Sequence, residues 1–265
     1  MYSPVKLTKK YIQYYWQANN SKGHGMHSPF VFSFITKVLN DTTAYKDYAR
    51  VEAMRQALLQ DRTVIEVQDF GAGSVTTNSN QRKISAIARH AAKPKKFGQL
   101  LYRMVQFYKP QNILELGTSL GITSAYLALG NPQGRLITLE GAPAIATAAR
   151  QNFTRLQLQN IEQVVGPFEN TLDNVLSKNT PIDFAFLDGN HRLQPTLDYF
   201  EQLLPHIHND TILVFDDIHW SLEMEEAWQQ ITAHEAVRCS IDLFFVGVVL
   251  FRKEFLEKQH FAIRF

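Results

Sequence analysis

Residues 112–121, NILELGTSLG, constrain the fold of this chain more than any other stretch. A short apolar run ends in the acidic Glu115, and two glycines follow with three residues between them. A chain that leaves a buried parallel strand, turns on glycine and enters a helix forms a cradle for a nucleoside-like ligand. Gly117 would allow the sharp turn and the close approach of the ligand. Gly121 would let the start of the helix pack close to the strand.

The residues around this loop indicate which nucleoside fits. The dinucleotide fingerprint needs a further glycine where Ser119 stands, so the loop disfavours NAD. A turn-like stretch at 130–134 separates the following helix from a second expected strand, 135–139, which runs into Glu140. An acidic side chain at the tip of the second strand can accept hydrogen bonds from both ribose hydroxyls of a nucleoside.

The glycine loop and Glu140 together resemble the S-adenosylmethionine site of the class I methyltransferases, and ELGTSLG is similar to the catechol O-methyltransferase-like group. The resemblance covers residues 97–251 and implies a Rossmann-like α/β fold with S-adenosylmethionine as cofactor. The residues that it implies for cofactor binding are Glu115, Gly117, Thr118, Ser119, Gly121, Glu140, Gly166, Phe168 and Asp188.

Strand and helix patterns alternate after residue 96, which predicts a mostly parallel sheet covered on both faces. Two strand-like runs near the end, 237–242 and 244–251, are almost contiguous, so we expect them to pair antiparallel. The resemblance also implies an antiparallel final hairpin. The expected parallel strands are 112–116, 135–139, 161–165, 182–187 and 211–215.

The region before residue 96 is mainly helical by its patterns. The expected helices are 9–18, 29–39, 45–60 and 83–92, and Ser28 can cap the second of them, with Pro29 at its first position. We expect an N-terminal helical extension over 1–95 and an S-adenosylmethionine-binding methyltransferase domain over 96–265. The resemblance implies that the extension forms a lid over the substrate.

Two segments of the extension allow more than one interpretation. Residues 64–74 look like a strand running into a glycine loop, but no second strand with an acidic tip follows. We expect a hairpin or loop there, and the alternative is that residues 69–74 line the substrate pocket. His24 and His27 are too few ligands for a metal site. They belong either to an active-site lid or to an ordinary flexible loop.

Composition narrows the partners and the compartment. A formal net charge of +2 is too small to indicate a nucleic acid or an anionic membrane as partner. The single cysteine, Cys239, excludes an intrachain disulfide and is typical of a reducing compartment. Residues 1–20 lack the apolar core of a signal peptide, and the longest apolar run is too short to span a membrane. We therefore expect a cytoplasmic protein with a small-molecule substrate. Whether the protein forms a homodimer is left open.

Polar clusters follow the fourth and fifth expected parallel strands, at 188–191 (DGNH) and 216–220 (DDIHW). Open α/β sheets bind ligands at these carboxyl ends. Asp188, Asp216 and Asp217 could hold a hard divalent cation such as Mg²⁺ through oxygen. The pattern resembles metal-dependent catechol-type and sugar O-methyltransferases. In the catechol type the position of Asp217 is commonly Asn, which leaves the identity of the metal open.

His191 is the expected general base, because it lies three positions after Asp188 and can share its pocket. The alternative is a solvent-exposed loop histidine. A phenol has a pKa near ~10 and histidine near ~6.5, so proton transfer is uphill by about 5 kcal/mol. A bound cation could offset most of that by lowering the pKa of a ligating oxygen. Asp216 and Asp217 could instead cap the next helix, but Ser221 is the better cap.

The sequence therefore predicts an S-adenosylmethionine-dependent methyltransferase that acts on a hydroxyl of a small molecule. The expected catalytic residues are His191 and Asp188. Whether a divalent metal assists the reaction is left open. Two alternatives remain. One is a noncatalytic nucleoside-binding or scaffold protein with the same fold. The other is an NAD-dependent oxidoreductase, which Ser119 disfavours.

Overall fold

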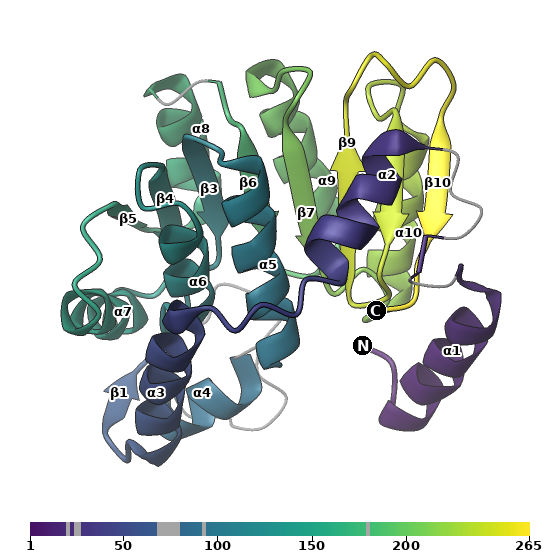
Figure 1. Cartoon of the computed structure of the whole chain (residues 1–265). Coiled ribbons are helices and arrows are strands. Elements are labelled where there is room, and N and C mark those ends of the chain that lie inside the picture. Colours follow the sequence, from purple (N-terminus) through teal and green to yellow (C-terminus); the bar gives the residue numbers. More distant parts are fainter. Residues whose placement is uncertain (20–21, 24–27, 68–79, 92–93, 179–180) are drawn as a thin grey trace. The chain divides into compact units, whose positions relative to one another are not determined.

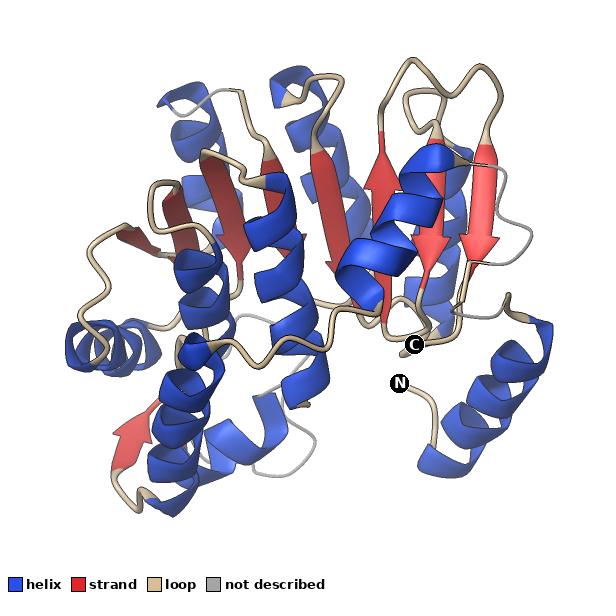
Figure 2. Ribbon diagram, viewed as in Figure 1, coloured by secondary structure: helices blue, strands red, loops and turns tan. Residues whose placement is uncertain are grey.

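The computed structural model describes residues 1–19, 22–23, 28–67, 80–91, 94–178 and 181–265 (Figures 1 and 2). The chain forms two compact units: unit 1 comprises Met1–Asn40 and Asn179–Phe265, and unit 2 comprises Asp41–Lys178. These units do not follow the expected boundary at residue 95, because residues 1–40 group with the C-terminal strands. The expected lid is a functional division and stays a prediction. The roles considered for His24, His27 and residues 69–74 fall outside the described residues.

Three parallel strands form the centre of unit 2, in the order of the chain: β3 (Asn112–Leu116), β4 (Arg135–Glu140) and β5 (Ile161–Val165). Side chains of β3 and β4 are mostly buried, whereas those of the outer β5 are half-buried or exposed. Because the strands are parallel, their carboxyl ends lie at one edge of the sheet. This edge carries the glycine loop.

Helices cover both faces of these strands: in Figure 1, α5 and α6 lie on one side and α8 lies on the other. Gly130 at the end of α6 lets this helix approach α5 closely, because a Cβ there would lie 2.8 Å from the Tyr102 carbonyl oxygen. The helices are α5 (Lys95–Tyr108), α6 (Ile122–Gly130), α7 (Pro143–Arg155) and α8 (Phe168–Lys178).

The remaining elements of unit 2 form a helical layer with a small hairpin: α3 (Lys46–Gln60), β1 (Val64–Glu66), β2 (Gln81–Lys83) and α4 (Ile84–Ala91). β1 pairs antiparallel with β2, with Val64 opposite Lys83. The segment from residue 64, for which we expected a hairpin or a loop, thus takes part in an antiparallel strand pair within the described residues. Buried apolar side chains of α3 and α4, including Val51 and Ile87, pack with Tyr126 of α6 in one core cluster.

The described residues of unit 1 form five strands: β6 (Phe184–Leu187), β7 (Ile212–Asp216), β8 (Cys239–Asp242), β9 (Val246–Leu250) and β10 (Gln259–Ala262). Their order is β10-β8-β9-β7-β6. β6 and β7 are parallel, and β9 pairs antiparallel with both β7 and β8. The expected antiparallel pairing near the end of the chain is confirmed. The parallel pairing of β10 with β8 was not predicted, because this short strand begins with the polar Gln259-His260 and has no clear apolar alternation.

Helices lie on both sides of these strands: in Figure 1, α2 lies in front and α9 and α10 lie behind. Ser28 caps α2 as expected, since its hydroxyl accepts the Val31 N–H at 3.4 Å. α1 begins at Pro4, earlier than predicted, because Ser3 caps it by accepting the Lys6 N–H at 3.3 Å. The helices are α1 (Pro4–Gln17), α2 (Pro29–Phe34), η1 (Ile35–Leu39), α9 (Leu193–Leu203), η2 (Leu204–His206) and α10 (Leu222–Ala233).

The observed architecture is the predicted mixed α/β fold, with mostly parallel strands between helices. None of the helices in the described part of the chain combines the length and the apolar character needed to cross a bilayer.

Candidate active site

The glycine loop is anchored on the neighbouring strand of unit 2. Leu116, the last residue of β3, lies opposite Leu139 of β4. The next two N–H groups of the loop, those of Gly117 and Thr118, both donate to the Leu139 carbonyl oxygen, at 3.0 and 3.1 Å. Gly117 has φ of +104°, a conformation that favours glycine. The turn predicted at this glycine is thus present.

Glu140 meets the glycine loop directly. One oxygen of its carboxylate accepts the Ser119 N–H at 2.8 Å, and the other accepts the Ala142 N–H at 2.9 Å. The register of β3 and β4 explains this contact, because Glu140 follows the residue opposite Leu116. The structure therefore brings together the two features that the sequence separates by about twenty residues.

A buried polar network lies beneath the loop. The Glu115 side chain is fully buried, and one of its oxygens accepts hydrogen bonds from the hydroxyls of Ser124 and Thr138, the latter at 2.6 Å. The Thr118 hydroxyl lies 2.6 Å from that of Thr138. Glu115 and Thr118 thus point into the protein, where they link the loop to β4 and α6. This network was not visible in the sequence, because its members come from three elements.

Gly121 explains how tightly the loop packs. Its φ is +80°, and a Cβ there would lie 2.4 Å from Cε1 of Phe153 on α7. The sequence-based expectation was a close approach of the helix start to the strand, and the group that the structure places closest to Gly121 is an aromatic ring of the next helix. Ser119 also has a positive φ, +47°, although it is not glycine. Ser119 therefore holds a strained backbone next to Glu140.

Gly166 and Phe168 follow β5 at the same edge of the sheet. The Gly166 N–H donates to the Glu140 carbonyl oxygen at 2.9 Å, which brings the end of β5 to the end of β4. Phe168 is the first residue of α8 and is half-buried. Both residues follow the third expected strand, 161–165, as in the sequence, and their role in cofactor binding stays a prediction.

In unit 1 the structure brings together Asp188, His191 and Asp216, whose candidate ligand atoms all lie within 4.8 Å of one another. Leu187 lies opposite Phe215 in the parallel pair β6 and β7, so Asp188 and Asp216 are the next residues on neighbouring strands. Asp216 is buried, and His191 Nε2 lies 3.3 Å from an oxygen of Asp188. His191 reaches this position through a tight turn in which both Asn190 and His191 have positive φ.

Asp217 is held differently from its neighbour. It has φ of +53°, its N–H donates to the Phe245 carbonyl oxygen at 2.7 Å, and its own carbonyl accepts the Trp220 N–H at 2.9 Å. Among the described residues, the group with suitable ligand spacing contains His191 and does not contain Asp217. The predicted metal set of Asp188, Asp216 and Asp217 therefore shares two members with the observed group.

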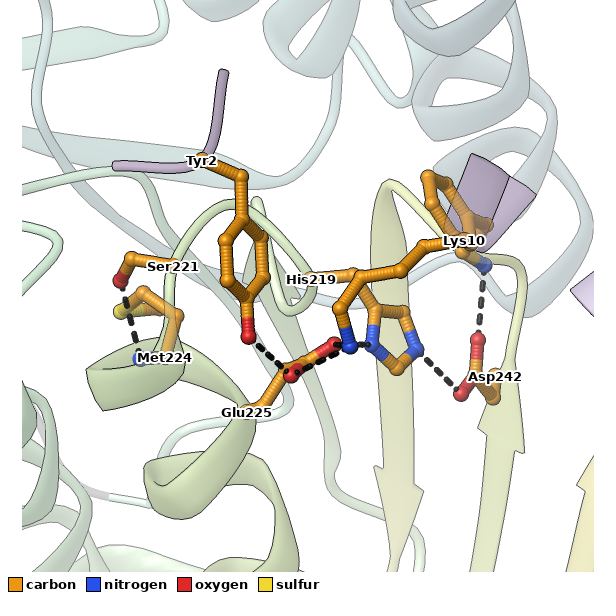
Figure 3. A network of polar contacts seen from close by, with 8 residues as sticks. Tyr2, Lys10, His219, Ser221, Met224, Glu225 and Asp242 are labelled. Carbon is orange, nitrogen blue, oxygen red and sulfur yellow. Dashed lines mark hydrogen bonds and ion pairs between the residues drawn. The ribbon is translucent and has the colours of Figure 1, made fainter. Parts of the chain in front are cut away.

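His219 belongs to a polar cluster for which the sequence predicted no role (Figure 3). Its Nε2 lies 2.8 Å from a carboxylate oxygen of Asp242, and its Nδ1 lies 3.1 Å from Glu225. Burial alone would lower the pKa of His219, but the hydrogen bonds and charges of Asp242 and Glu225 outweigh burial and raise it. No spacing pattern could have revealed the cluster, because Lys10 and Tyr2, which also bind Glu225, are more than 200 residues away in the sequence.

Comparisons with known proteins agree with this geometry. A family model described as a methyltransferase domain matches residues 114–218, which include the glycine loop and the acidic strand ends. A catechol O-methyltransferase of Niastella koreensis is 26% identical over 191 residues, covering 71% of this chain and 74% of that protein. A catechol O-methyltransferase of Mycobacterium tuberculosis is 30% identical over 123 residues, covering 46% of this chain and 54% of that protein.

A solved structure shares the fold. The O-methyltransferase from Bacillus cereus in complex with S-adenosylhomocysteine superposes with a TM-score of 0.56 at 22% identity, covering 83% of this chain and 97% of that one. The glycine loop, the acid at the tip of the second strand, the order of the strands and the matching family model point to one conclusion. These findings support an S-adenosylmethionine-dependent methyltransferase, and the chain is similar to the catechol O-methyltransferase-like group of class I.

Proposed function

We propose that this methyltransferase transfers the methyl group of S-adenosylmethionine to a hydroxyl oxygen of a small molecule. The observation that supports the cofactor site most directly is the contact between Glu140 and the glycine loop. Each carboxylate oxygen that accepts a backbone N–H keeps a further acceptor position. Glu140 can therefore also accept the ribose hydroxyls of the cofactor, while Gly117, Ser119 and Gly121 form the loop beside them.

The other predicted cofactor residues have two kinds of role in this proposal. Glu115 and Thr118 are buried, so they support the loop from inside the protein instead of presenting a polar group to solvent. Gly166 and Phe168 follow the end of β5, and the Gly166 N–H contacts the Glu140 carbonyl oxygen, so in this proposal the Phe168 ring stacks on the adenine. Asp188 stays a predicted cofactor contact.

The acceptor end of the proposed site is the group of Asp188, His191 and Asp216. Two carboxylates and an imidazole form a donor set that fits a divalent cation; the carboxylates suit Mg²⁺ or Mn²⁺, and the imidazole makes the set more favourable to a transition metal than an all-oxygen set would be. One contribution of a cation held there would be to lower the pKa of a ligating hydroxyl. Asp217 is a candidate to bind the acceptor or a water next to this group.

His191 is the proposed general base. In the reaction the acceptor oxygen attacks the methyl carbon in line, the new O–C bond forms as the C–S bond breaks, and S-adenosylhomocysteine leaves. The hydroxyl proton passes to His191 Nδ1, because Nε2 faces the Asp188 carboxylate at 3.3 Å and carries the other N–H, and this carboxylate favours the imidazolium that forms. The same nitrogen cannot act as a metal ligand and as a base at once, so the two roles of His191 can be separated by experiment.

Calorimetric titration with Mn²⁺ and Mg²⁺ tests the cation site. We expect Asp188→Asn and Asp216→Asn to weaken cation binding at least about 10-fold. Asp183→Asn is the matched control, because Asp183 precedes β6 and contacts His208 at 2.8 Å. His191→Gln decides the role of the imidazole: lost cation affinity would identify a ligand, and retained affinity with lost methyl transfer would identify a base. Unchanged affinity in both aspartate variants would contradict cation binding at this group.

A transfer assay with methyl-labelled S-adenosylmethionine tests the reaction itself. We expect a labelled methyl ether when phenols, catechols and sugars are offered as acceptors, because the site holds acidic groups suited to a hydroxyl. The noncatalytic alternative predicts S-adenosylhomocysteine binding without transfer to any of these classes. A small-molecule acceptor, a cytoplasmic location and the open possibility of a homodimer are parts of the same proposal, and the single cysteine, Cys239, supports the location.

A further inference from the structure

Glu225, on α10, connects the N-terminal segment to the loop that follows β7 (Figure 3). The Tyr2 hydroxyl donates to its carboxylate at 2.6 Å, and Lys10 Nζ lies 2.8 and 2.9 Å from its two oxygens. His219 Nδ1 lies 3.1 Å from the same carboxylate. One acidic side chain therefore joins two residues of the N-terminal segment to a histidine of the loop.

The loop that carries His219 begins at the acidic end of β7. Asp217, Ile218, His219 and Trp220 connect Asp216 to Ser221, which caps α10 by accepting the Met224 N–H at 3.2 Å. The N-terminal segment also contacts the backbone of this loop, because the Tyr2 N–H donates to the Trp220 carbonyl oxygen at 3.0 Å. The loop is thus held both by a main-chain hydrogen bond and through its histidine.

The opposite side of the His219 ring is fixed as well. Its Nε2 lies 2.8 Å from Asp242, whose other oxygen accepts the Phe244 N–H at 2.7 Å. The ring also stacks on Phe244, with centroids 5.0 Å apart and planes at 25°. Asp242 and Glu225 together leave the imidazole little rotational freedom, since each of its nitrogens has a carboxylate partner.

We propose that Glu225 is a positioning residue, which acts through His219 and the N-terminal helix to fix the loop that bears Asp217 and follows Asp216. This inference rests on the proposed function, because it assigns the loop's fixed geometry to the acceptor end of that site. Asp217 has φ of +53°, a backbone conformation that persists only where surrounding contacts enforce it. The Glu225 cluster supplies such contacts from outside the loop.

Docking of α1 alone does not require this cluster. The rings of Tyr11 and Tyr14 already pack on Phe244 at 5.0 and 5.2 Å between centroids, and the Tyr14 hydroxyl donates to the Asp242 carbonyl oxygen at 3.0 Å. Aromatic packing holds a helix in place without aiming a particular loop. Ion pairs and hydrogen bonds depend on orientation, so they can fix the position of a loop, and here they converge on His219.

The test compares Glu225→Gln with the control Glu226→Gln. Glu226 lies on the same helix, and its exposed carboxylate accepts a hydrogen bond from the Gln230 amide at 3.3 Å. Hydrogen exchange is followed at the amides of Asp217 and Trp220, and calorimetry gives the affinities for Mn²⁺ and S-adenosylhomocysteine. We expect faster exchange at both amides and about 10-fold weaker Mn²⁺ binding for Glu225→Gln. S-adenosylhomocysteine affinity should stay within about 2-fold, because the cofactor loop lies in unit 2.

Lys10→Gln provides a second variant that leaves Glu225 in place, in case Glu225→Gln does not fold. It should accelerate exchange at the same two amides, and the KM for the acceptor should rise while that for S-adenosylmethionine does not. If Glu225→Gln and Lys10→Gln showed the same amide exchange rates and the same acceptor KM as Glu226→Gln, the inference would be overturned. Failure of the wild-type protein to bind S-adenosylhomocysteine would instead refute the proposed function, and the exchange measurement would still decide whether Glu225 orders the loop.

Discussion

At the residue scale, positive backbone φ angles mark both parts of the candidate site. Among the described non-glycine residues with positive φ, Ser119 lies in the glycine loop, and Asn190, His191 and Asp217 lie at the acidic strand ends. Each such conformation costs about 1–2 kcal/mol for an ordinary side chain. Folded proteins keep strain of this kind mainly where it positions functional groups. The residues with positive φ therefore lie in the same two clusters that the contacts define: the glycine loop with Glu140, and the acidic strand ends.

Gly121→Ala should destabilise the protein by at least about 1 kcal/mol, because alanine disfavours φ of +80° and its Cβ would clash with Phe153. Ser119→Gly should instead raise the free energy of unfolding, since glycine adopts φ of +47° without strain. Urea unfolding of both variants measures these free energies. If Gly121→Ala were as stable as Ser119→Gly, the packing described for the loop would be wrong.

Cys239 should be unreactive in the native protein. It is fully buried in β8, and burial raises the pKa of its thiol to about 12, so almost no thiolate is present at pH 8. Iodoacetamide should therefore label the protein at pH 8 only after denaturation, as followed by mass spectrometry. Labelling at similar rates in native buffer and in urea would contradict this burial.

At the element scale, the parallel strand register determines which predicted residues meet. The expected strands 112–116 and 161–165 match the structure, and the others are shifted at their ends by one to two residues. The sequence could therefore predict that Asp188 and Asp216, and likewise Gly117 and Glu140, lie at the carboxyl ends of neighbouring strands. The sequence also predicted that His191 shares the pocket of Asp188, but it could not predict the two consecutive positive φ angles through which His191 reaches this position.

Contacts between segments that are distant in the sequence could not be predicted either. The strand β10 and the cluster around Glu225 depend on pairings across the whole of unit 1, for which no local periodicity exists. The early start of α1 did leave a local signal, Ser3 before Pro4, but the apolar pattern alone begins later. Local chemistry therefore predicted elements and strand ends, whereas tertiary contacts decided the polar clusters.

The stability contributed by Glu225 should depend on pH. Burial raises the pKa of this carboxyl, but hydrogen bonds from Lys10, Tyr2 and His219 outweigh burial, so its pKa lies below the ordinary value. A carboxyl with a lowered folded pKa stabilises the protein above its unfolded pKa, near ~4.3, and this contribution is lost as pH falls through the folded value. We expect Glu225→Gln to cost about 1–3 kcal/mol at pH 7.

Urea unfolding of wild type and Glu225→Gln at several pH values measures this dependence. The difference in unfolding free energy should shrink steadily below pH 4, and it should be near its full value from pH 6 to pH 7. A difference that grows on acidification would show that the Glu225 carboxylate is not stabilised by its partners.

At the scale of the whole molecule, each compact unit contains one group of candidate site residues. Unit 2 contains the glycine loop and Glu140, and unit 1 contains the group of Asp188, His191 and Asp216. The chain begins in unit 1, builds unit 2 and then returns to unit 1. The N-terminal segment is thereby joined to the C-terminal strands, as the bridge between Asn19 and Ile263 shows.

Calorimetric titration with S-adenosylhomocysteine and NAD tests the cofactor site most directly. We predict that S-adenosylhomocysteine binds the wild-type protein at one site and that NAD does not bind. Glu140→Ala should weaken the binding about 10- to 100-fold, because it removes hydrogen bonds to a charged group. Glu162→Ala is the matched control, since this exposed carboxylate pairs with Arg135 in the same unit. No binding of S-adenosylhomocysteine, or equal affinities in both variants, would contradict the assignment of Glu140 and the glycine loop to the cofactor.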